Sequence, residues 1–532
     1  MPAFPLHLSP QKRAFLTGTL LLTGTGFLCR ILGFFYRIFL SRAIGAQGLG
    51  IYNMVHPVFS ICFALCAGSM QTALSQYVAA NQRKGKSALR TGLILSLSLS
   101  FLLTAFICCF SSPIAKYLLL EPDCGPYVFL IALSVPFAAL HACINGLYYG
   151  MQKSRIPAFS QVAEQILRMT AVFFMVCSLE KQGLSLNVSL AVYGHLIGEA
   201  ASATFTAVCM VLWPPVSRQN SSDFTPKDFR TMAFSLSKLS LPLMGNRLIL
   251  NLLGSAEAIW IPNRLTAFGL ETADAFAVYG VLTGMALPFI MFPSAITNSM
   301  AVLLLPAVAQ SQAEGNQRRI SSAVSMALRY SLYMGILCTG IFCLYGRELG
   351  TSVFENPSAG AYIRVLGWLC PFMYLATTLG SILNGLGKTS STFLQNVCAM
   401  CIRLLFVLMG IPRLGIKAYL IGILASEIFL SCWHLITLKK LVNFHWNAAD
   451  IIAKPVLLLL TGSWINRKLW GILSSVIHPV LLNPGTPLSF MGTALQIGTL
   501  CMFYGVLLGL WHLFISEENS SAAFWGSPKH FT

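Results

Sequence analysis

The sequence predicts an all-α polytopic membrane protein, and three observations support this class. Of its 532 residues, 56% are hydrophobic and only 10% are charged, whereas a soluble protein carries about 25% charged residues. The apolar residues gather in blocks, most of them of about 20 residues, the length at which a helix crosses the hydrocarbon core of a bilayer. Short polar stretches separate these blocks. A transmembrane β-barrel would instead show alternating segments of about ten residues.

The apolar blocks predict about fourteen membrane-spanning helices. Their approximate residues are 15–40, 50–80, 91–112, 127–150, 158–179, 187–212, 233–260, 276–308, 321–345, 361–386, 392–412, 417–437, 451–470 and 489–514. The second and eighth blocks are too long for one straight crossing and contain prolines, so we expect kinks or tilt there. The block 451–470 is short and ends in Arg467 and Lys468, which makes it the weakest of the fourteen.

The basic residues indicate how the chain is inserted. The net charge is +18, and the Lys and Arg residues responsible for it lie largely in short loops and at the ends of the blocks. With the N-terminus in the cytoplasm, the inner segments hold roughly twice as many Lys and Arg residues as the outer ones, which favours cytoplasmic N- and C-termini. We therefore expect a multi-pass membrane protein with both chain termini in the cytoplasm. No nucleic-acid-binding motif accompanies the positive charge, so no nucleic-acid partner is expected.

The cysteines are interpreted as small apolar residues. All sixteen are scattered, most of them within apolar blocks, and Cys398 and Cys401 form a CxxC motif without a second pair or a nearby histidine. Such residues pack as small hydrophobes in a membrane interior. We expect no metal site.

An internal repeat divides the chain. Three motifs of the first half recur in the same order about 230 to 240 residues later. They are Ser69-Met70 with Ser299-Met300, Val78-Ala79 with Val308-Ala309, and Asn145-Gly146-Leu147 with Asn384-Gly385-Leu386. Arg168 also matches Arg403 at a similar offset. Six helices per repeat give both halves one orientation, which predicts a pseudo-two-fold axis along the membrane normal with the site between the halves. We expect six-helix lobes at 1–225 and 226–445, and two helices with a cytoplasmic tail at 446–532.

Two arginines in the first predicted helix are the strongest candidates for a site. Arg30 and Arg37 are seven residues apart and share one helix face. A cation at membrane depth costs at least about 2.5 kcal/mol, so each requires a partner or water. We interpret this face as lining a wet, positively charged cavity that binds an anion. The alternative is that each arginine pairs with a buried acid or a helix-end carbonyl.

The seventh predicted helix is polar and interrupted in the same way. Pro242, Gly245 and Gly254 break it. Its candidate site residues are Asn246, Arg247, Asn251, Glu257 and Arg264. Polar, glycine-interrupted helices at corresponding positions of two halves point to a transport site. For Glu257 two roles stay open: neutralising Arg247 or Arg264, or binding a coupling cation.

Other polar residues inside the blocks are interpreted mainly as packing. The pairs are Glu164 with Arg168, His195 with Glu199, Glu427 with His434, and the repeat-related Asn145 and Asn384. For the first pair we expect a local ion pair, and for the asparagines caps or interhelical hydrogen bonds. The pair His195 and Glu199 is expected to be a polar contact between helices, with a proton relay as the alternative.

No catalytic constellation is present in the sequence. It contains no P-loop, no G-x-S-x-G and no H-x-x-x-H motif. We therefore predict a protein that is not an enzyme, has no catalytic residue and uses no cofactor. Its energy source is expected to be Na+ or H+ coupling, the membrane potential or the gradient of its substrate.

Several segments resemble one known family. CRILGFFYRIFLSRAIGAQGLGIYNMVHPVFS is similar to the first helix and following loop of the stage V sporulation protein B group. IPNRLTAFGL and YGVLTGMALPFIMFPSAITNSMAVLLLPAVAQS resemble its seventh and eighth helices, and LNGLGKTS resembles the loop after its tenth. This group is a branch of the multidrug/oligosaccharidyl-lipid/polysaccharide (MOP) exporter superfamily, which also holds the lipid II flippases. The resemblance covers nearly the whole chain.

The resemblance implies an architecture and an activity. It implies two six-helix lobes that face each other in a V, with two C-terminal helices as a place for a lipid tail. It implies transfer of an undecaprenyl-diphosphate-linked saccharide from the inner to the outer leaflet by alternating access. Lipid II flippases use arginines in the first helix, matched here by Arg30 and by Arg37 or Tyr36. They also carry arginines in the second and eighth helices, where this sequence has His56-Pro57 and an apolar segment.

The expected function is therefore a flippase for a lipid-linked saccharide. Peptidoglycan precursor lipid II, for the spore cortex or cell wall, is the leading substrate, and a teichoic-acid or exopolysaccharide precursor is the alternative. A cation-coupled multidrug exporter is a second class, but it would require acids in the cavity. A scaffold for cell-wall enzymes would require large cytoplasmic loops. Expected partners are the lipid-linked saccharide, membrane lipids and, further, cell-wall synthesis enzymes.

Overall fold

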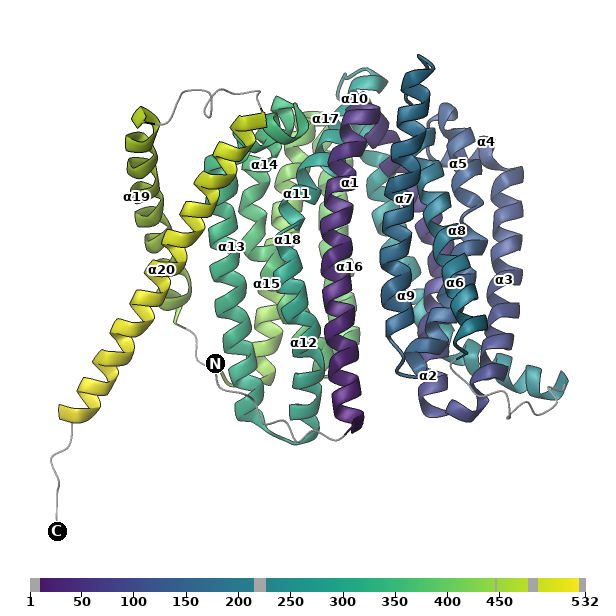
Figure 1. Cartoon of the computed structure of the whole chain (residues 1–532), viewed down its shortest axis with the longest axis horizontal. Coiled ribbons are helices and arrows are strands. Elements are labelled where there is room, and N and C mark those ends of the chain that lie inside the picture. Colours follow the sequence, from purple (N-terminus) through teal and green to yellow (C-terminus); the bar gives the residue numbers. More distant parts are fainter. Residues whose placement is uncertain (1–9, 215–225, 445–446, 477–486, 526–532) are drawn as a thin grey trace, which may run out of the picture. The chain divides into compact units, whose positions relative to one another are not determined.

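The computed structural model describes residues 10–214, 226–444, 447–476 and 487–525, and among these it contains helices and no strand (Figure 1). This confirms the predicted all-α class. In chain order the helices are α1 (Pro10–Phe63), α2 (Ser69–Ala80), α3 (Gly85–Cys109), α4 (Ser111–Pro113), α5 (Gly125–Ala132), α6 (Val135–Gly150), α7 (Arg155–Lys181), α8 (Ser189–Leu212), α9 (Pro226–Ala267), α10 (Thr272–Gly280), α11 (Leu287–Met291), α12 (Ser294–Ala313), α13 (Gln317–Phe354), α14 (Pro357–Leu366), α15 (Cys370–Gly385), α16 (Thr389–Leu405), α17 (Ile411–Leu414), α18 (Ile416–Leu441), α19 (Lys454–Val476) and α20 (Pro487–Trp525).

Twelve helical segments of the described residues are long and apolar enough to cross a membrane, against the fourteen expected. The first two predicted crossings form one helical segment, Leu21–Ala80. At 1.5 Å per residue it is about 90 Å long, enough for two crossings. Gly45 breaks it, because its φ of 69° is a left-handed conformation that favours glycine.

Two further departures from the predicted crossings have a chemical or steric cause. The expected crossing 276–308 is split in two at Phe292 and Pro293, between α11 and α12. The helices α9 and α19, expected to cross, are not among the twelve. Both carry several polar and charged side chains along their length, which lowers their mean hydropathy.

The chain divides into two compact units. The first comprises Met1–Pro288 with Phe393–Ser426, and the second comprises Phe289–Thr392 with Glu427–Thr532. This division by compactness does not coincide with the lobe boundaries expected at residues 225 and 445, which stay a prediction.

The repeated Asn-Gly-Leu motif makes the same close helix contact in each unit. In the first unit, Gly146 of α6 lies against α2, where an added Cβ would come within 2.7 Å of the Gln71 carbonyl oxygen. In the second, Gly385 of α15 lies against α12, where it would come within 2.8 Å of the Leu305 carbonyl oxygen. Only glycine allows the two backbones to approach this closely. The matching contacts support the internal repeat.

The asparagines that precede these glycines form the expected interhelical hydrogen bonds. Asn145 Nδ2 donates to Ser160 Oγ at 3.4 Å, which joins α6 to α7. Thr392 Oγ1 donates to Asn384 Oδ1 at 2.6 Å, which joins α16 to α15.

A polar knot fastens the two C-terminal helices to α13 in the second unit. Asn466 of α19 is buried, and its Nδ2 donates to Tyr345 Oη of α13 at 2.9 Å and to the Gln496 carbonyl of α20 at 3.1 Å. Thr499 Oγ1 of α20 donates to Asn466 Oδ1 at 2.6 Å. Trp470 Nε1 in turn donates to Thr499 Oγ1 at 3.0 Å. One side chain thus links three helices.

Candidate functional site

The two arginines of α1 lie in different surroundings. Arg30 is exposed and makes no hydrogen bond or ion pair with the described residues. Arg37 is half-buried and lies within electrostatic reach of Tyr36, Tyr52 and Arg168. Tyr52 follows the kink at Gly45, so the turn in α1 brings its second part back toward Arg37. Since no break interrupts the helix between Arg30 and Arg37, the two share one face as predicted.

Two of the predicted residues of α9 contact the first helices of the same unit. Arg247 Nη2 donates to Thr72 Oγ1 of α2 at 3.1 Å. Its guanidinium lies over Gly68, where an added Cβ would come within 2.3 Å of Nη1. Asn251 Nδ2 donates to the Ser60 carbonyl of α1 at 2.9 Å. The chain therefore brings Arg247 and Asn251 to the α1–α2 segment.

The other two polar candidates of α9 have fewer contacts. Asn246 is exposed and Arg264 is half-buried. Neither makes a hydrogen bond or ion pair with the part of the chain that the structure describes.

Glu257 has a partner that the sequence did not suggest. Its Oε2 lies 2.8 Å from Arg403 Nε of α16, and its Oε1 accepts a hydrogen bond from Tyr419 Oη of α18. The expected neutralisation of Arg247 or Arg264 is therefore replaced by a pair with Arg403.

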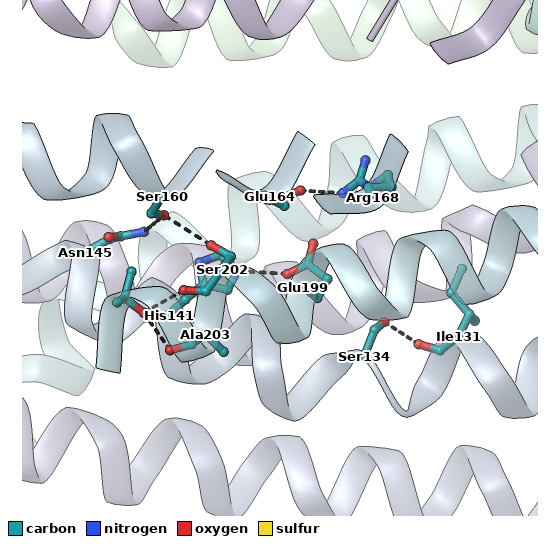
Figure 2. A network of polar contacts seen from close by, with 11 residues as sticks. Ile131, Ser134, His141, Asn145, Ser160, Glu164, Arg168, Glu199, Ser202 and Ala203 are labelled. Atoms are coloured by element: carbon teal, nitrogen blue, oxygen red, sulfur yellow. Dashed lines mark hydrogen bonds and ion pairs between the residues drawn. The ribbon is translucent and has the colours of Figure 1, made fainter. Parts of the chain in front are cut away.

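A second group of charged residues lies between α6, α7 and α8 (Figure 2). Arg168 and Glu164 form the expected ion pair on α7. Glu199 of α8 is paired with His141 Nε2 of α6 at 2.8 Å. The expected polar contact between helices is confirmed for Glu199, whose partner is His141 of α6, but not for His195, whose Nε2 has no hydrogen-bond partner among the described residues.

His195 packs against aromatic rings instead. Its ring meets Phe59 edge-on at 4.4 Å between centroids and lies 5.5 Å from the ring of His56. This places His56, which stands where the lipid II flippases carry an arginine, in an aromatic contact with α8.

Two glycines of α8 make room for this charged group. An added Cβ at Gly198 would lie 2.8 Å from Arg168 Nε, and one at Gly194 would lie 3.0 Å from Tyr36 Oη. The spacing of four residues places both glycines on one helix face. The side chains of Arg168 and Tyr36 therefore occupy the space that side chains at 194 and 198 would fill.

The charges of the first unit do not cancel at the predicted site. Three intramembrane acids have basic partners: Glu164 with Arg168, Glu199 with His141, and Glu257 with Arg403. Four arginines make no ion pair with a carboxylate among the described residues: Arg30, Arg37, Arg247 and Arg264. Such guanidinium groups offer several donors in a fixed fork that matches phosphate and carboxylate oxygens. Each of these guanidinium groups can therefore bind an anion that carries several oxygen acceptors.

Sequence reasoning missed His141 and Arg403 as partners. His141 lies 58 residues from Glu199, and Arg403 lies 146 residues from Glu257, so no local spacing links them. One signal was available for Arg403, because it matches Arg168 in the internal repeat.

Comparison with known proteins yields a family and several relatives. The family model described as polysaccharide biosynthesis protein matches residues 15–312. Stage V sporulation protein B of Bacillus subtilis (strain 168) is 26% identical over 458 residues, covering 85% of this chain and 88% of that protein. Lipid II flippase MurJ of the same organism is 22% identical over 503 residues, covering 88% and 89%.

A solved structure has the same fold. Lipid II flippase MurJ in an inward closed conformation matches with a TM-score of 0.69 at 13% identity, covering 93% of this chain and 99% of that one. Together the matches confirm the resemblance to stage V sporulation protein B and to the MOP exporters. Because the family model matches more than half of its residues, the chain belongs to the polysaccharide biosynthesis protein family.

Proposed function

We propose that this multi-pass membrane protein is a flippase that moves an undecaprenyl-diphosphate-linked saccharide from the inner to the outer leaflet. It acts in a bacterial cell membrane, with both chain termini in the cytoplasm, by alternating access. The observation that carries the proposal is the unequal charge pairing of the first unit, where the acids are paired and Arg30, Arg37, Arg247 and Arg264 are not. The relatives named as a lipid II flippase and a sporulation protein support it.

A diphosphate fits these arginines physically. At an effective dielectric constant of about 20, one arginine and one phosphate charge at about 4 Å attract by roughly 4 kcal/mol before desolvation is subtracted. Two such contacts would balance much of the cost of bringing the headgroup out of water. The polyprenyl tail stays in the lipid, so only the headgroup requires a polar route.

Net transport requires more than a positive site. The affinity for the headgroup must differ between the inward-open and outward-open states, since equal binding shifts no equilibrium. We infer that the membrane potential or the substrate gradient supplies the direction.

Among saccharides, we propose lipid II as the substrate, for the spore cortex or the cell wall. The names of the two B. subtilis relatives support this choice. A teichoic-acid or exopolysaccharide precursor is the second candidate, because His56 stands at a position where lipid II flippases carry an arginine, and its ring packs on His195.

The test is replacement of the resident flippase in a cell depleted of it. With this chain as the replacement, labelled lipid II is expected to reach the outer leaflet, and Arg30→Ala is expected to abolish transfer at a normal membrane level. Arg83→Ala is the matched control, since Arg83 is an exposed basic residue of the loop before α3. Loss of transfer in both variants, or in neither, contradicts the site.

Failure of the unaltered chain despite normal expression would reject lipid II. The same chain would then be tested in vesicles with an undecaprenyl-diphosphate saccharide that lacks the peptide. Transfer of that lipid would retain the flippase class, and its absence would reject it.

A further inference from the structure

Glu257 is held by groups from three neighbouring segments of the first unit. Arg403 of α16 lies 2.8 Å away, and the hydroxyl of Tyr419, at the start of α18, donates to the other carboxylate oxygen. Tyr279 of α10 lies within electrostatic reach of the same carboxylate. The side chains of Glu257 and Arg403 are 12% and 19% exposed, so the pair is largely shielded.

The oxygen groups here are those that a hard monovalent cation prefers. A carboxylate beside hydroxyl oxygens is a set of donors that suits Na+ chemically. In this chain the place next to the carboxylate is taken by Arg403 Nε. A guanidinium fixed to the chain cannot leave and return, as a coupling ion must.

We propose that Arg403 is a tethered cation for Glu257, so that this carboxylate binds no Na+ and contributes no Na+ coupling to transport. The inference refines the energetics of the proposed transporter, and its test requires no substrate. It also assigns a second role to the pair, which is to fasten α9 to α16 at a fixed distance.

The internal repeat supports this assignment. Arg168, the counterpart of Arg403, has an acid one turn earlier on its own helix, at Glu164. One turn before Arg403 the chain has Ala399, so the balancing charge must come from another helix. Glu257 supplies it.

The packing around the pair is consistent with a fixed contact. Met400 of α16 lies beside Gly254 of α9, where an added Cβ would lie 3.7 Å from the methionine methyl group, an ordinary van der Waals distance. The two helices are therefore neighbours one turn before Glu257. Glu257 itself lies within the continuous helix α9, between Pro242 and Pro262.

The experiment is a thermal unfolding measurement on the full chain in lipid nanodiscs, with Na+ replaced by choline at constant ionic strength. The wild type is expected to unfold at the same temperature in both salts. Arg403→Gln removes the tethered cation, so its unfolding temperature is expected to fall in choline and to recover partly in Na+. Arg403→Lys keeps a cation and is expected to show no Na+ response.

Controls separate the site from general effects of salt. Glu257→Gln leaves Arg403 without its carboxylate and is expected to unfold earlier in both salts. The double variant Glu257→Gln with Arg403→Gln is expected to unfold at a higher temperature than either single variant in choline, and its unfolding temperature is expected not to change with Na+. Recovery in the double variant identifies the pair itself as the source of stability.

Two results would overturn the proposal. One is a wild-type unfolding temperature that rises with Na+ and loses this rise in Glu257→Gln. The other is a folded Arg403→Gln variant that shows no Na+ response. If Arg403→Gln does not fold, Arg403→Lys and the wild type decide, because both must be insensitive to Na+. A failed flippase assay beside these expected shifts would reject the proposed function and leave the tethered cation standing.

Discussion

Alanine at Gly198 is expected to destabilise the charged group between α6, α7 and α8. The added Cβ would lie 2.8 Å from Arg168 Nε and 3.1 Å from Nη2. It would also lie 3.4 Å from Arg168 Cβ, an ordinary van der Waals distance, so the outer part of the arginine side chain is the part that must move. Arg168 must then move away from Glu164. Because both side chains are mostly shielded from solvent, separating the two charges costs free energy.

The magnitude follows from two effects. Overpacking of a filled interior costs about 1–3 kcal/mol. Weakening a shielded ion pair adds to this, because removal of one partner outright costs about 3–5 kcal/mol and a partial separation costs a fraction of it. We expect Gly198→Ala to lower the free energy of unfolding by about 2–4 kcal/mol.

The assay is reversible unfolding of the purified chain in mixed micelles of increasing denaturing detergent. Gly33→Ala is the matched control, because Gly33 is also helical and nothing lies within 4 Å of an added Cβ there. That variant is expected to be neutral or slightly more stable, since alanine favours a helix by up to about 1 kcal/mol over glycine.

A double-variant cycle identifies the cause. Methionine lacks the guanidinium nitrogens that an alanine at position 198 would meet. In an Arg168→Met background, Gly198→Ala is therefore expected to lower the free energy of unfolding clearly less than in the wild type. An equal cost in both backgrounds, or no cost in the wild type, would refute the steric argument.

Three further predictions follow from single contacts. Arg37→Ala is expected to reduce substrate affinity about 10- to 100-fold, the equivalent of one charge-assisted hydrogen bond, and Arg37→Lys is expected to restore part of it. The measurement is a lipid-transfer assay, in which equal activity of the wild type and both variants would exclude Arg37 from the site. Gly68→Ala is expected to push the Arg247 guanidinium off Thr72 and slow transfer. The added Cβ would also lie 2.8 Å from Phe63 Cε1, so a loss of stability of about 1–3 kcal/mol is expected beside it; unchanged transfer would contradict the role of Arg247. Asn466→Leu is expected to raise hydrogen exchange in α19 and α20, at a cost of about 1–3 kcal/mol; unchanged protection there would show that the knot is dispensable.

The fold class and the repeat were accessible from the sequence because both depend on local patterns. Blocks of apolar residues require membrane helices, and the motif around Gly146 and Gly385 records a contact at which only glycine fits. The number of crossings was less accessible. The break at Gly45 falls between the predicted blocks 15–40 and 50–80, but the split of the block 276–308 at Phe292 and Pro293 depends on backbone geometry that residue type alone does not reveal.

The site was predictable in composition and not in pairing. Arg30, Arg37 and Arg247 stood out because cations at membrane depth are costly. The partners of Glu257 and Glu199 did not, because ion pairs between helices depend on which faces meet, and the sequence separations are long. Only the pair on α7, spaced by one helical turn, could be predicted from spacing alone.

The knot around Asn466 has a mechanical consequence. Because Asn466 is buried, separating α19 or α20 from α13 would leave buried amide and hydroxyl groups without hydrogen-bond partners. We therefore expect α13, α19 and α20 to tilt and translate together as one rigid group. Any displacement of α13 during a transport cycle carries the C-terminal pair with it, and the surface that this pair offers to lipid keeps its shape while its position changes.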